Sequence, residues 1–223
     1  MKKCICFLFF IFFFSFLFCG KLKAQIKVFT FNSDSLEVGF GKKSMISKDS
    51  PMTFVVNGPL YGADSLPVGG YVDNFHQVKI WQNPTEFGGN FAVRNCVFGR
   101  KTNGKFFMSS YDNQSSSDSI QWAIQNGFSL VIGGKNVCNP NSDSNTSRSG
   151  IGYREKMLVV IISENVITPY KFAELFIREG CSDAIFLDGG PEVGYSYKDH
   201  NSLSKSSAIK LQFFHFSPMY EIK

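Results

Sequence analysis

The sequence has few of the residues on which common catalytic and metal-binding motifs depend. It contains three histidines among 223 residues, His76, His200 and His215, and their spacing matches no metal-binding motif. It also has no G-x-S-x-G nucleophile elbow, no Walker loop and no Rossmann glycine pattern. These absences argue against the familiar zinc hydrolase, α/β-hydrolase and nucleotide-binding classes, and we expect neither a metal nor a cofactor.

The sequence also lacks a basic cluster, although its formal net charge is +5. Residues 1–24 begin with two lysines after Met1, continue as an apolar run and end at Ala24, which is typical of a secretory signal peptide. Four of the 23 basic residues and none of the 18 acidic residues lie there, so the remaining chain is nearly neutral. We therefore expect a cleaved signal peptide, a secreted or periplasmic protein without stable membrane insertion, and no nucleic-acid partner. An uncleaved membrane anchor is the alternative. The sequence carries no signal for an oligomeric state.

Cysteine is also scarce beyond the leader. Cys96, Cys138 and Cys181 are an odd number in an oxidising compartment, which permits at most one intramolecular disulfide. Their spacing suits no zinc site. We expect buried thiols.

Residues 25–223 are long enough for one domain, and short β-rich segments dominate them. Helices are expected over 117–127 and over 168–180, where Thr168 is a candidate N-cap and Pro169 suits the first helical position. The strand–helix–strand order of 157–187 predicts a local parallel pair. The pattern as a whole predicts a single-domain α+β, or mixed α/β, fold with a strand-rich mixed sheet. The expected strands are 26–31, 53–56, 77–81, 91–98, 105–109, 129–132, 157–162, 184–187 and 210–216, and the expected surface loops are 112–119 and 139–149.

One aspartate stands at the end of an apolar strand. In "DAIFLDGGPEVGYSY", Asp188 follows the strand and precedes Gly189 and Gly190. Ligands bind at such strand ends in open sheets, and glycines let a ligand approach the backbone. The alternative is an Asp-Gly hairpin turn without chemistry.

Two further polar residues lie beside glycines at strand boundaries. Arg148 closes a polar loop before Gly150 and Gly152, where a guanidinium can grip a phosphate or carboxylate. Asn57-Gly58 follows another β-rich segment, and an amide suits sugar hydroxyls or phosphate oxygens. The alternatives are a solvated loop arginine and a turn asparagine.

In their order along the chain, these pieces resemble the phosphodiester glycosidase family. The resemblance implies a secreted hydrolase of carbohydrate or exopolysaccharide metabolism that cleaves a sugar-1-phosphodiester or related glycan linkage, with a phosphorylated sugar or glycan as its substrate. It places this domain over 25–223. The matching segments, between Phe54 and Gly190, are "FVVNG", "LPVGGY", "GGNFAVRNCVF", "AIQNGFSLVIGG", "RSGIGY" and "FAELFIREGCSDAIFLDGG".

The resemblance also implies roles for individual residues. Arg148 would hold the phosphate with help from Asn57, and Asp188 would serve the sugar as base for water, as nucleophile or as electrostatic partner. The implied catalytic residues are thus Asp188, Arg148 and Asn57, and the implied substrate-binding residues are Gly58, Asn90, Gln125, Gly189 and Gly190.

Some positions depart from the family pattern. Asn126 stands where a serine is usual, and Pro191-Glu192 follows the double glycine where a small residue is usual. Glu192 is either a second carboxylate of the site or a surface residue. The rival interpretation is a non-catalytic secreted protein that binds a glycan or phosphoglycan in the same pocket.

Overall fold

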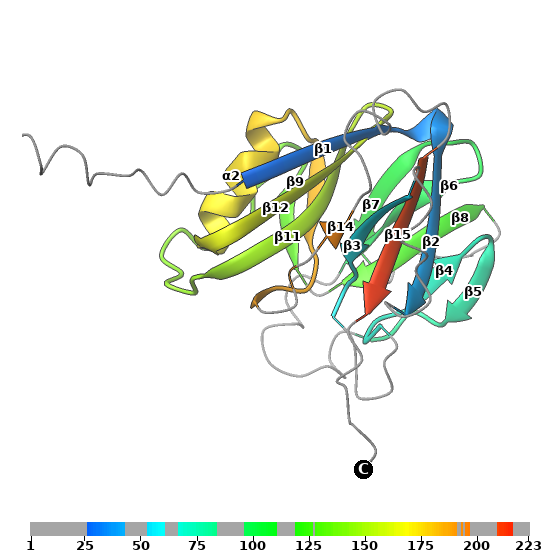
Figure 1. Cartoon of the computed structure of the whole chain (residues 1–223), viewed down its shortest axis with the longest axis horizontal. Helices are drawn as coiled ribbons and strands as arrows, with labels where there is room; N and C mark the ends of the chain where they lie inside the picture. Colours follow the sequence, from blue (N-terminus) through cyan, green and yellow to red (C-terminus); the bar gives the residue numbers. More distant parts are fainter. Residues whose placement is uncertain are drawn as a thin grey trace, which may run out of the picture.

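The computed structural model describes residues 26–42, 53–60, 67–83, 96–110, 119–126, 128–190, 193, 195–196 and 209–215. Within these ranges the chain forms three β-sheets and one α-helix (Figure 1). The expected strand-rich fold is confirmed in this broad sense. The expected signal peptide lies outside the described residues. No helix in the described part of the chain is long and apolar enough to cross a membrane.

The elements agree with most of the expected strands. Of the expected strand 91–98, residues 91–95 lie outside the described ranges. In chain order the elements are β1 (Ile26–Asn32), η1 (Ser33–Ser35), β2 (Leu36–Lys42), β3 (Thr53–Asn57), β4 (Tyr71–Asp73), β5 (His76–Lys79), β6 (Cys96–Lys101), β7 (Phe106–Ser110), β8 (Ile120–Asn126), β9 (Ser129–Ile132), β10 (Lys135–Asn136), β11 (Thr146–Arg154), β12 (Met157–Ile167), α2 (Pro169–Arg178), β13 (Asp183–Phe186), β14 (Tyr195–Ser196) and β15 (Ile209–His215).

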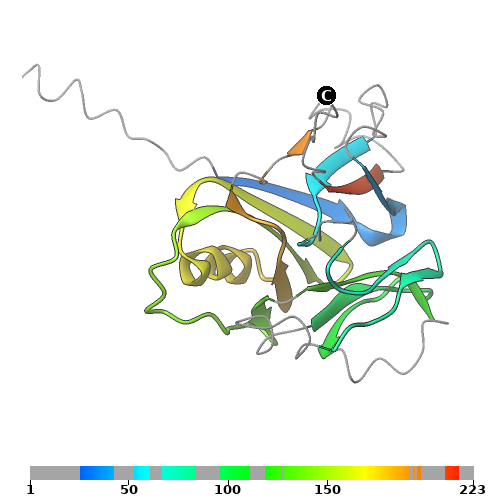
Figure 2. The same ribbon diagram turned by 90° about the horizontal axis from the view of Figure 1, so that it is seen from below.

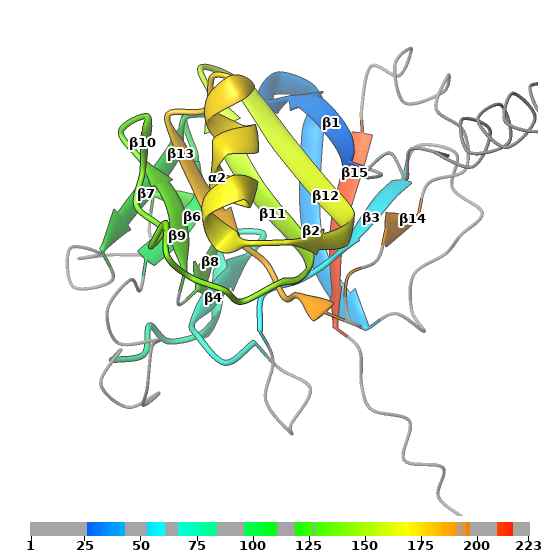
Figure 3. The same cartoon turned by 90° about the vertical axis from the view of Figure 1, so that its left-hand side faces the viewer.

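The largest sheet has six strands in the order β1-β12-β11-β13-β9-β10, and all neighbours are antiparallel. The interior strand β12 is buried on both faces over residues 158–163, because α2 covers one face and the other two sheets lie beyond the opposite face (Figures 2 and 3). Val159 and Ile161 accordingly pack against the helix. Leu158, Val160 and Ile162 point the other way, into a core to which all three sheets contribute side chains. A core shared by three sheets makes the described part of the chain one domain.

Helix α2 begins and ends where the sequence predicts. The Thr168 hydroxyl accepts a 3.2 Å hydrogen bond from the Lys171 N–H, and Gly180 follows the helix with φ of 75°. Gly150 of β11 lets the helix approach closely, since a Cβ there would lie 3.1 Å from the rings of both Phe172 and Phe176.

The expected parallel pair around this helix is wrong in one respect. Strands β12 and β13 run in the same direction, but β11 lies between them and pairs antiparallel with both. Strand β11 begins at Thr146, so the expected loop 139–149 ends earlier than predicted.

The helix expected over 117–127 is also wrong. Residues 120–126 form β8, which lies between β4 and β6 in a five-stranded antiparallel sheet ordered β5-β4-β8-β6-β7. Trp122 and Ile124 pack in the main core, whereas Ala123 between them packs with Val72 and Val97, an alternation that is typical of a strand. Pairing with β4 and β6 satisfies the backbone hydrogen-bonding groups of this segment on both sides.

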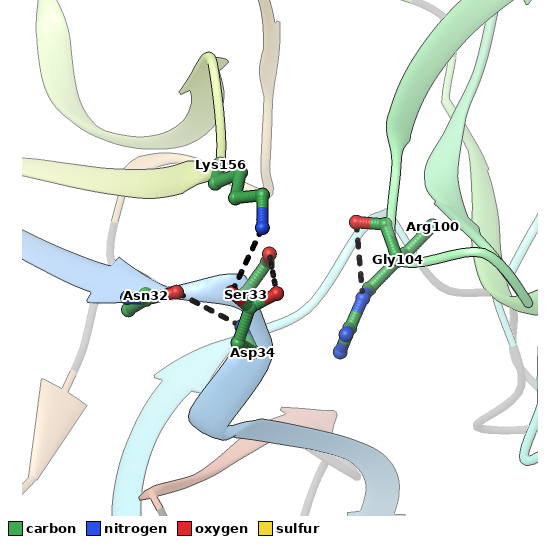
Figure 4. Close-up of polar contacts among 6 residues, drawn as sticks. All are labelled: Asn32, Ser33, Asp34, Arg100, Gly104 and Lys156. Carbon is green, nitrogen blue, oxygen red and sulfur yellow. Dashed lines mark hydrogen bonds and ion pairs between the residues drawn. The ribbon is translucent and has the colours of Figure 1, made fainter.

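The remaining sheet, ordered β14-β3-β15-β2, is the mixed one, since β15 is parallel to both β2 and β3. The turn η1 joins it to the six-stranded sheet (Figure 4). The Lys156 ammonium lies 3.0 Å from the Asp34 carboxylate, and this hydrogen bond lowers the pKa of Asp34. Arg100 of β6 donates a 3.0 Å hydrogen bond to the Leu36 carbonyl, which links the five-stranded sheet to the same corner.

All three cysteines of the described ranges are buried free thiols, which confirms the expectation. Burial raises the pKa of Cys96 and of Cys181 to about 12 in each case.

Candidate active site

The backbone of Asp188 is the meeting point of three strands from two sheets. Its N–H donates a 3.0 Å hydrogen bond to the Gly58 carbonyl, just beyond β3. Its carbonyl accepts two hydrogen bonds, one of 2.8 Å from Asn57 Nδ2 at the end of β3 and one of 3.0 Å from Ser149 Oγ in β11. Both donor side chains are buried, with 1% of Asn57 and none of Ser149 exposed. The position of Asp188 is therefore fixed from both sheets.

The side chain of Asp188 is half-buried, and its Oδ1 accepts a 2.9 Å hydrogen bond from the N–H of Gly189. The residue does not lead into a hairpin, because β13 pairs with β11 and β9 whereas the next strand, β14, pairs with β3 of another sheet. Gly189 is required for space, since a Cβ there would lie 2.6 Å from the Phe186 ring. Gly190 is required for its backbone, which has φ of 68°.

Arg148 is a buried cation held by neutral groups. Its side chain is 4% exposed. Its Nε donates a 2.6 Å hydrogen bond to the Ile167 carbonyl, and its Nη2 donates to the Ser144 carbonyl at 2.7 Å and to Ser144 Oγ at 3.3 Å. The guanidinium carbon lies 5.2 Å from the centroid of the Phe186 ring. Burial lowers the pKa of Arg148 from its ordinary value.

The charge of Arg148 has no acidic counterpart within ion-pair distance in the described part of the chain. Its Nη1 makes none of the hydrogen bonds found there. Arg148 lines a cavity of about 600 Å³ whose wall carries the rings of Phe128 and Phe186. Besides Arg148, the polar part of the wall comes from Ser129, Asn139, Asn141, Ser142, Asp143 and Ser144.

Arg148 and Asp188 lie opposite each other at one end of the β11–β13 pair. Gly150 is paired with Phe186, and the Leu187 N–H donates a 2.9 Å hydrogen bond to the Ser149 carbonyl, so the register continues to Arg148 opposite Asp188. The hydrogen bonds of Arg148 point away from Asp188, and Asp188 does not line the cavity. The structure thus groups Asn57, Gly58, Asp188 and Gly189 directly, with Arg148 as their cross-strand neighbour.

Gln125 serves another part of the chain. Its side chain is 1% exposed, and its Oε1 accepts 2.8 Å hydrogen bonds from the N–H groups of both Gly70 and Gln82. Its Nε2 donates a 2.7 Å hydrogen bond to the Gln82 carbonyl. Gln125 therefore holds the backbone on either side of β4 and β5. The other two positions named from the sequence, Asn90 and Glu192, lie outside the described residues.

Two polar residues of this region make contacts that the sequence does not predict. Ser149 holds Asp188, and Asn126 donates a hydrogen bond from Nδ2 to the Phe186 carbonyl, which joins β8 to β13. Each stands directly after a residue that the motifs did mark, Arg148 and Gln125. Their position directly after a motif residue is the feature of the sequence that could have identified them.

Comparison with known proteins gives relatives of limited similarity. The uncharacterized protein YigE of Escherichia coli (strain K12) is 26% identical over 184 residues, which cover 80% of this chain and 68% of that protein. The catalytic domain of zebrafish N-acetylglucosamine-1-phosphodiester alpha-N-acetylglucosaminidase, auto-inhibited by its pro-peptide, is 17% identical with a TM-score of 0.48 over 64% of this chain and 52% of that one. A hypothetical protein from Synechocystis is 12% identical with a TM-score of 0.42 over 78% of this chain and 53% of that one. The chain spans about half the length of these two solved structures.

The family comparison is more extensive. The model of the phosphodiester glycosidase family matches residues 50–212, a range that includes β3, β8, β11 and β13 and with them every residue assigned above to the candidate site. The match covers well over half of the sequence. The chain therefore belongs to the phosphodiester glycosidase family.

Proposed function

We propose that this protein is a secreted hydrolase that cleaves a sugar-1-phosphodiester or a related glycan linkage, with Arg148 binding the phosphate and Asp188 serving the sugar. The observation that carries the proposal is the state of Arg148, a buried guanidinium that forms no ion pair among the described residues, borders a cavity and lies opposite Asp188. Membership of the family supports the same chemistry.

A phosphate explains the environment of Arg148 better than water alone. A buried charge is costly unless a group of opposite charge or several hydrogen bonds compensate it. The carbonyls of Ile167 and Ser144 supply part of that compensation and fix the guanidinium plane. Nη1 makes no hydrogen bond to any described residue, so we assign it to an anion. Charge-assisted hydrogen bonds of guanidinium to phosphate are among the stronger ones in proteins.

The proposed reaction breaks the bond between the anomeric carbon and the phosphate oxygen. The electron pair of that bond leaves with the phosphate monoester, where the charge of Arg148 stabilises it. The oxygen of a water molecule adds to the anomeric carbon, directly or after a covalent intermediate with Asp188, and one water proton is released. The Asp188 carboxylate is proposed to take that proton, to form the intermediate, or to stabilise the positive charge that develops on the sugar.

The other predicted site residues have supporting places in this proposal. Asn57 acts through the backbone of Asp188, to which its amide nitrogen is bonded. Gly58 and Gly190 are proposed to lie beside the sugar, whereas Gly189 makes room for the Phe186 ring. Gln125 orders the neighbouring chain through Gly70 and Gln82. Asn90 stays a predicted substrate ligand.

A panel of sugar-1-phosphodiesters incubated with the wild-type protein and with Asp188→Asn tests the proposal. We expect release of free sugar and of a phosphate monoester by the wild type on at least one substrate. The rival, a non-catalytic phosphoglycan-binding protein, has in its favour that the Gly189 N–H already occupies one oxygen of Asp188. Saturable binding of the panel without any release of sugar would support that rival and contradict hydrolysis.

A further inference from the structure

We propose that Ser149 is a positioning residue for the reaction, which acts together with Asn57 by holding the single backbone carbonyl of Asp188. This inference rests on the proposed function, because it assigns Ser149 a part in that chemistry. Ser149 belongs to none of the roles that the family resemblance implied.

The geometry of the Asp188 carbonyl carries the proposal. It receives side-chain donors from two sheets, Asn57 at 2.8 Å and Ser149 at 3.0 Å, and both donors are buried. A backbone carbonyl has two lone pairs, and here side-chain donors from two different sheets occupy both. The N–H of the same residue is also bonded, to Gly58. Both peptide groups that flank the Cα of Asp188 are therefore restrained.

Restraint of these peptide groups fixes the carboxylate. The carbonyl of Asp188 and the N–H of Gly189 belong to one peptide plane, and that N–H donates to Asp188 Oδ1 at 2.9 Å. A hydrogen bond to the Asp188 carbonyl therefore also orients the Gly189 N–H, and this N–H in turn orients the Asp188 carboxylate. Displacement of a reacting group by about 1 Å can cost about a hundredfold in rate, so loss of an anchor is expected to affect kcat more than KM.

The chain offers a matched control at the other end of the same strand pair. Ser182 Oγ donates a 3.3 Å hydrogen bond to the Tyr153 carbonyl, again a serine hydroxyl on a backbone carbonyl between β11 and the β13 segment. Ser182 lies away from Asp188. Ser182→Ala therefore measures what the loss of such a hydrogen bond does to folding without touching the site.

Kinetics and amide hydrogen exchange of four proteins test the proposal: wild type, Ser149→Ala, Ser149→Thr and Ser182→Ala. We expect Ser149→Ala to lower kcat about tenfold or more with little change in KM, and to speed exchange of the Gly189 N–H. Ser149→Thr keeps the hydroxyl and should restore both, whereas Ser182→Ala should leave both unchanged.

Unchanged kcat and unchanged Gly189 exchange in a folded Ser149→Ala protein would overturn the proposal, as would a failure of Ser149→Thr to restore them. The exchange measurement needs no substrate. If the wild type shows no turnover on any substrate, the proposed function fails, and Gly189 exchange separately tests whether Ser149 anchors Asp188.

Discussion

The side-chain nitrogen of Asn57 lies 2.8 Å from the backbone oxygen of Asp188, a residue 131 positions later in the chain. This contact joins the end of β3 to the end of β13 and so ties two sheets together beside the proposed reaction centre. Its chemistry is specific, because the amide nitrogen is the donor and a carbonyl is the acceptor. An amide that holds the backbone of a carboxylate residue is a positioning group.

Asn57→Asp should destabilise the fold, because it replaces the donating nitrogen by an oxygen that repels the Asp188 carbonyl. We expect the free energy of unfolding to fall by about 2–4 kcal/mol, measured by urea denaturation. Asn103→Asp is the matched control, since the oxygen of Asn103 accepts from the Lys105 N–H and an aspartate keeps that oxygen. Equal stability of the two variants would contradict the role of the Asn57 nitrogen.

Arg148→Ala should weaken phosphate binding and slow the reaction together. The loss expected for a charge-assisted contact is about thirtyfold to a thousandfold in kcat/KM, with a parallel rise in the inhibition constant of inorganic phosphate. Arg100→Ala is the control, because Arg100 also donates to backbone carbonyls but does not line the cavity. A drop in stability without any change in phosphate inhibition would assign Arg148 a structural role.

Gly152→Ala should loosen the docking of α2 on β11. A Cβ at this position would lie 2.8 Å from the Asp183 carbonyl oxygen and 2.9 Å from the Phe176 ring. Such overpacking costs about 1–3 kcal/mol of folding free energy, measurable by thermal or urea denaturation. Unaltered stability would mean that helix and sheet separate more readily than the packing indicates.

The buried thiols should make the fold less stable at alkaline pH. Burial raises the pKa of Cys96 and of Cys181 to about 12, above the value of about 8.5 for an unfolded chain. Between these values the unfolded state binds fewer protons than the folded state. The contribution of the buried thiols to the free energy of unfolding is therefore complete below about pH 8.5. It declines as the pH rises, by up to about 1.4 kcal/mol per pH unit for each thiol.

Urea denaturation at about pH 7.5 and about pH 10.5 measures this decline. The Cys181→Ala protein should lose less stability over the same interval than the wild type. An identical decline in both proteins would show that other groups cause it. Alkylation of the native protein should be slow at neutral pH and should leave turnover intact.

The sequence predicts those parts of the fold that depend on local signals. Thr168, Pro169 and Gly180 mark the ends of α2 because a cap, a fixed φ and a positive φ are properties of single residues. Residues 120–126 were misassigned because their strand conformation depends on β4 and β6, which lie elsewhere in the chain. In the sequence, Ser117 suits a helix N-cap and Gly127 suits a helix end, but the non-local pairing outweighs these local signals.

The candidate site shows the same division. The position of Asp188 beyond a buried strand and before two glycines could be recognised in the sequence. The anchoring of its carbonyl by Asn57 and Ser149 could not, since it requires the register of β11 and the approach of β3. Gln125 differs most from its expected use, because its amide is bonded to backbone groups of Gly70 and Gln82.

The fate of the water oxygen tests the central claim most directly. The experiment takes a sugar-1-phosphodiester that the protein cleaves and hydrolyses it in water enriched in oxygen-18. Mass spectrometry of both products then shows which bond breaks. Attack at the anomeric carbon, served by Asp188, places the label on C1 of the released sugar and leaves the phosphate monoester unlabelled. Label in the phosphate would mean attack at phosphorus and would contradict the assignment of Asp188 to the sugar.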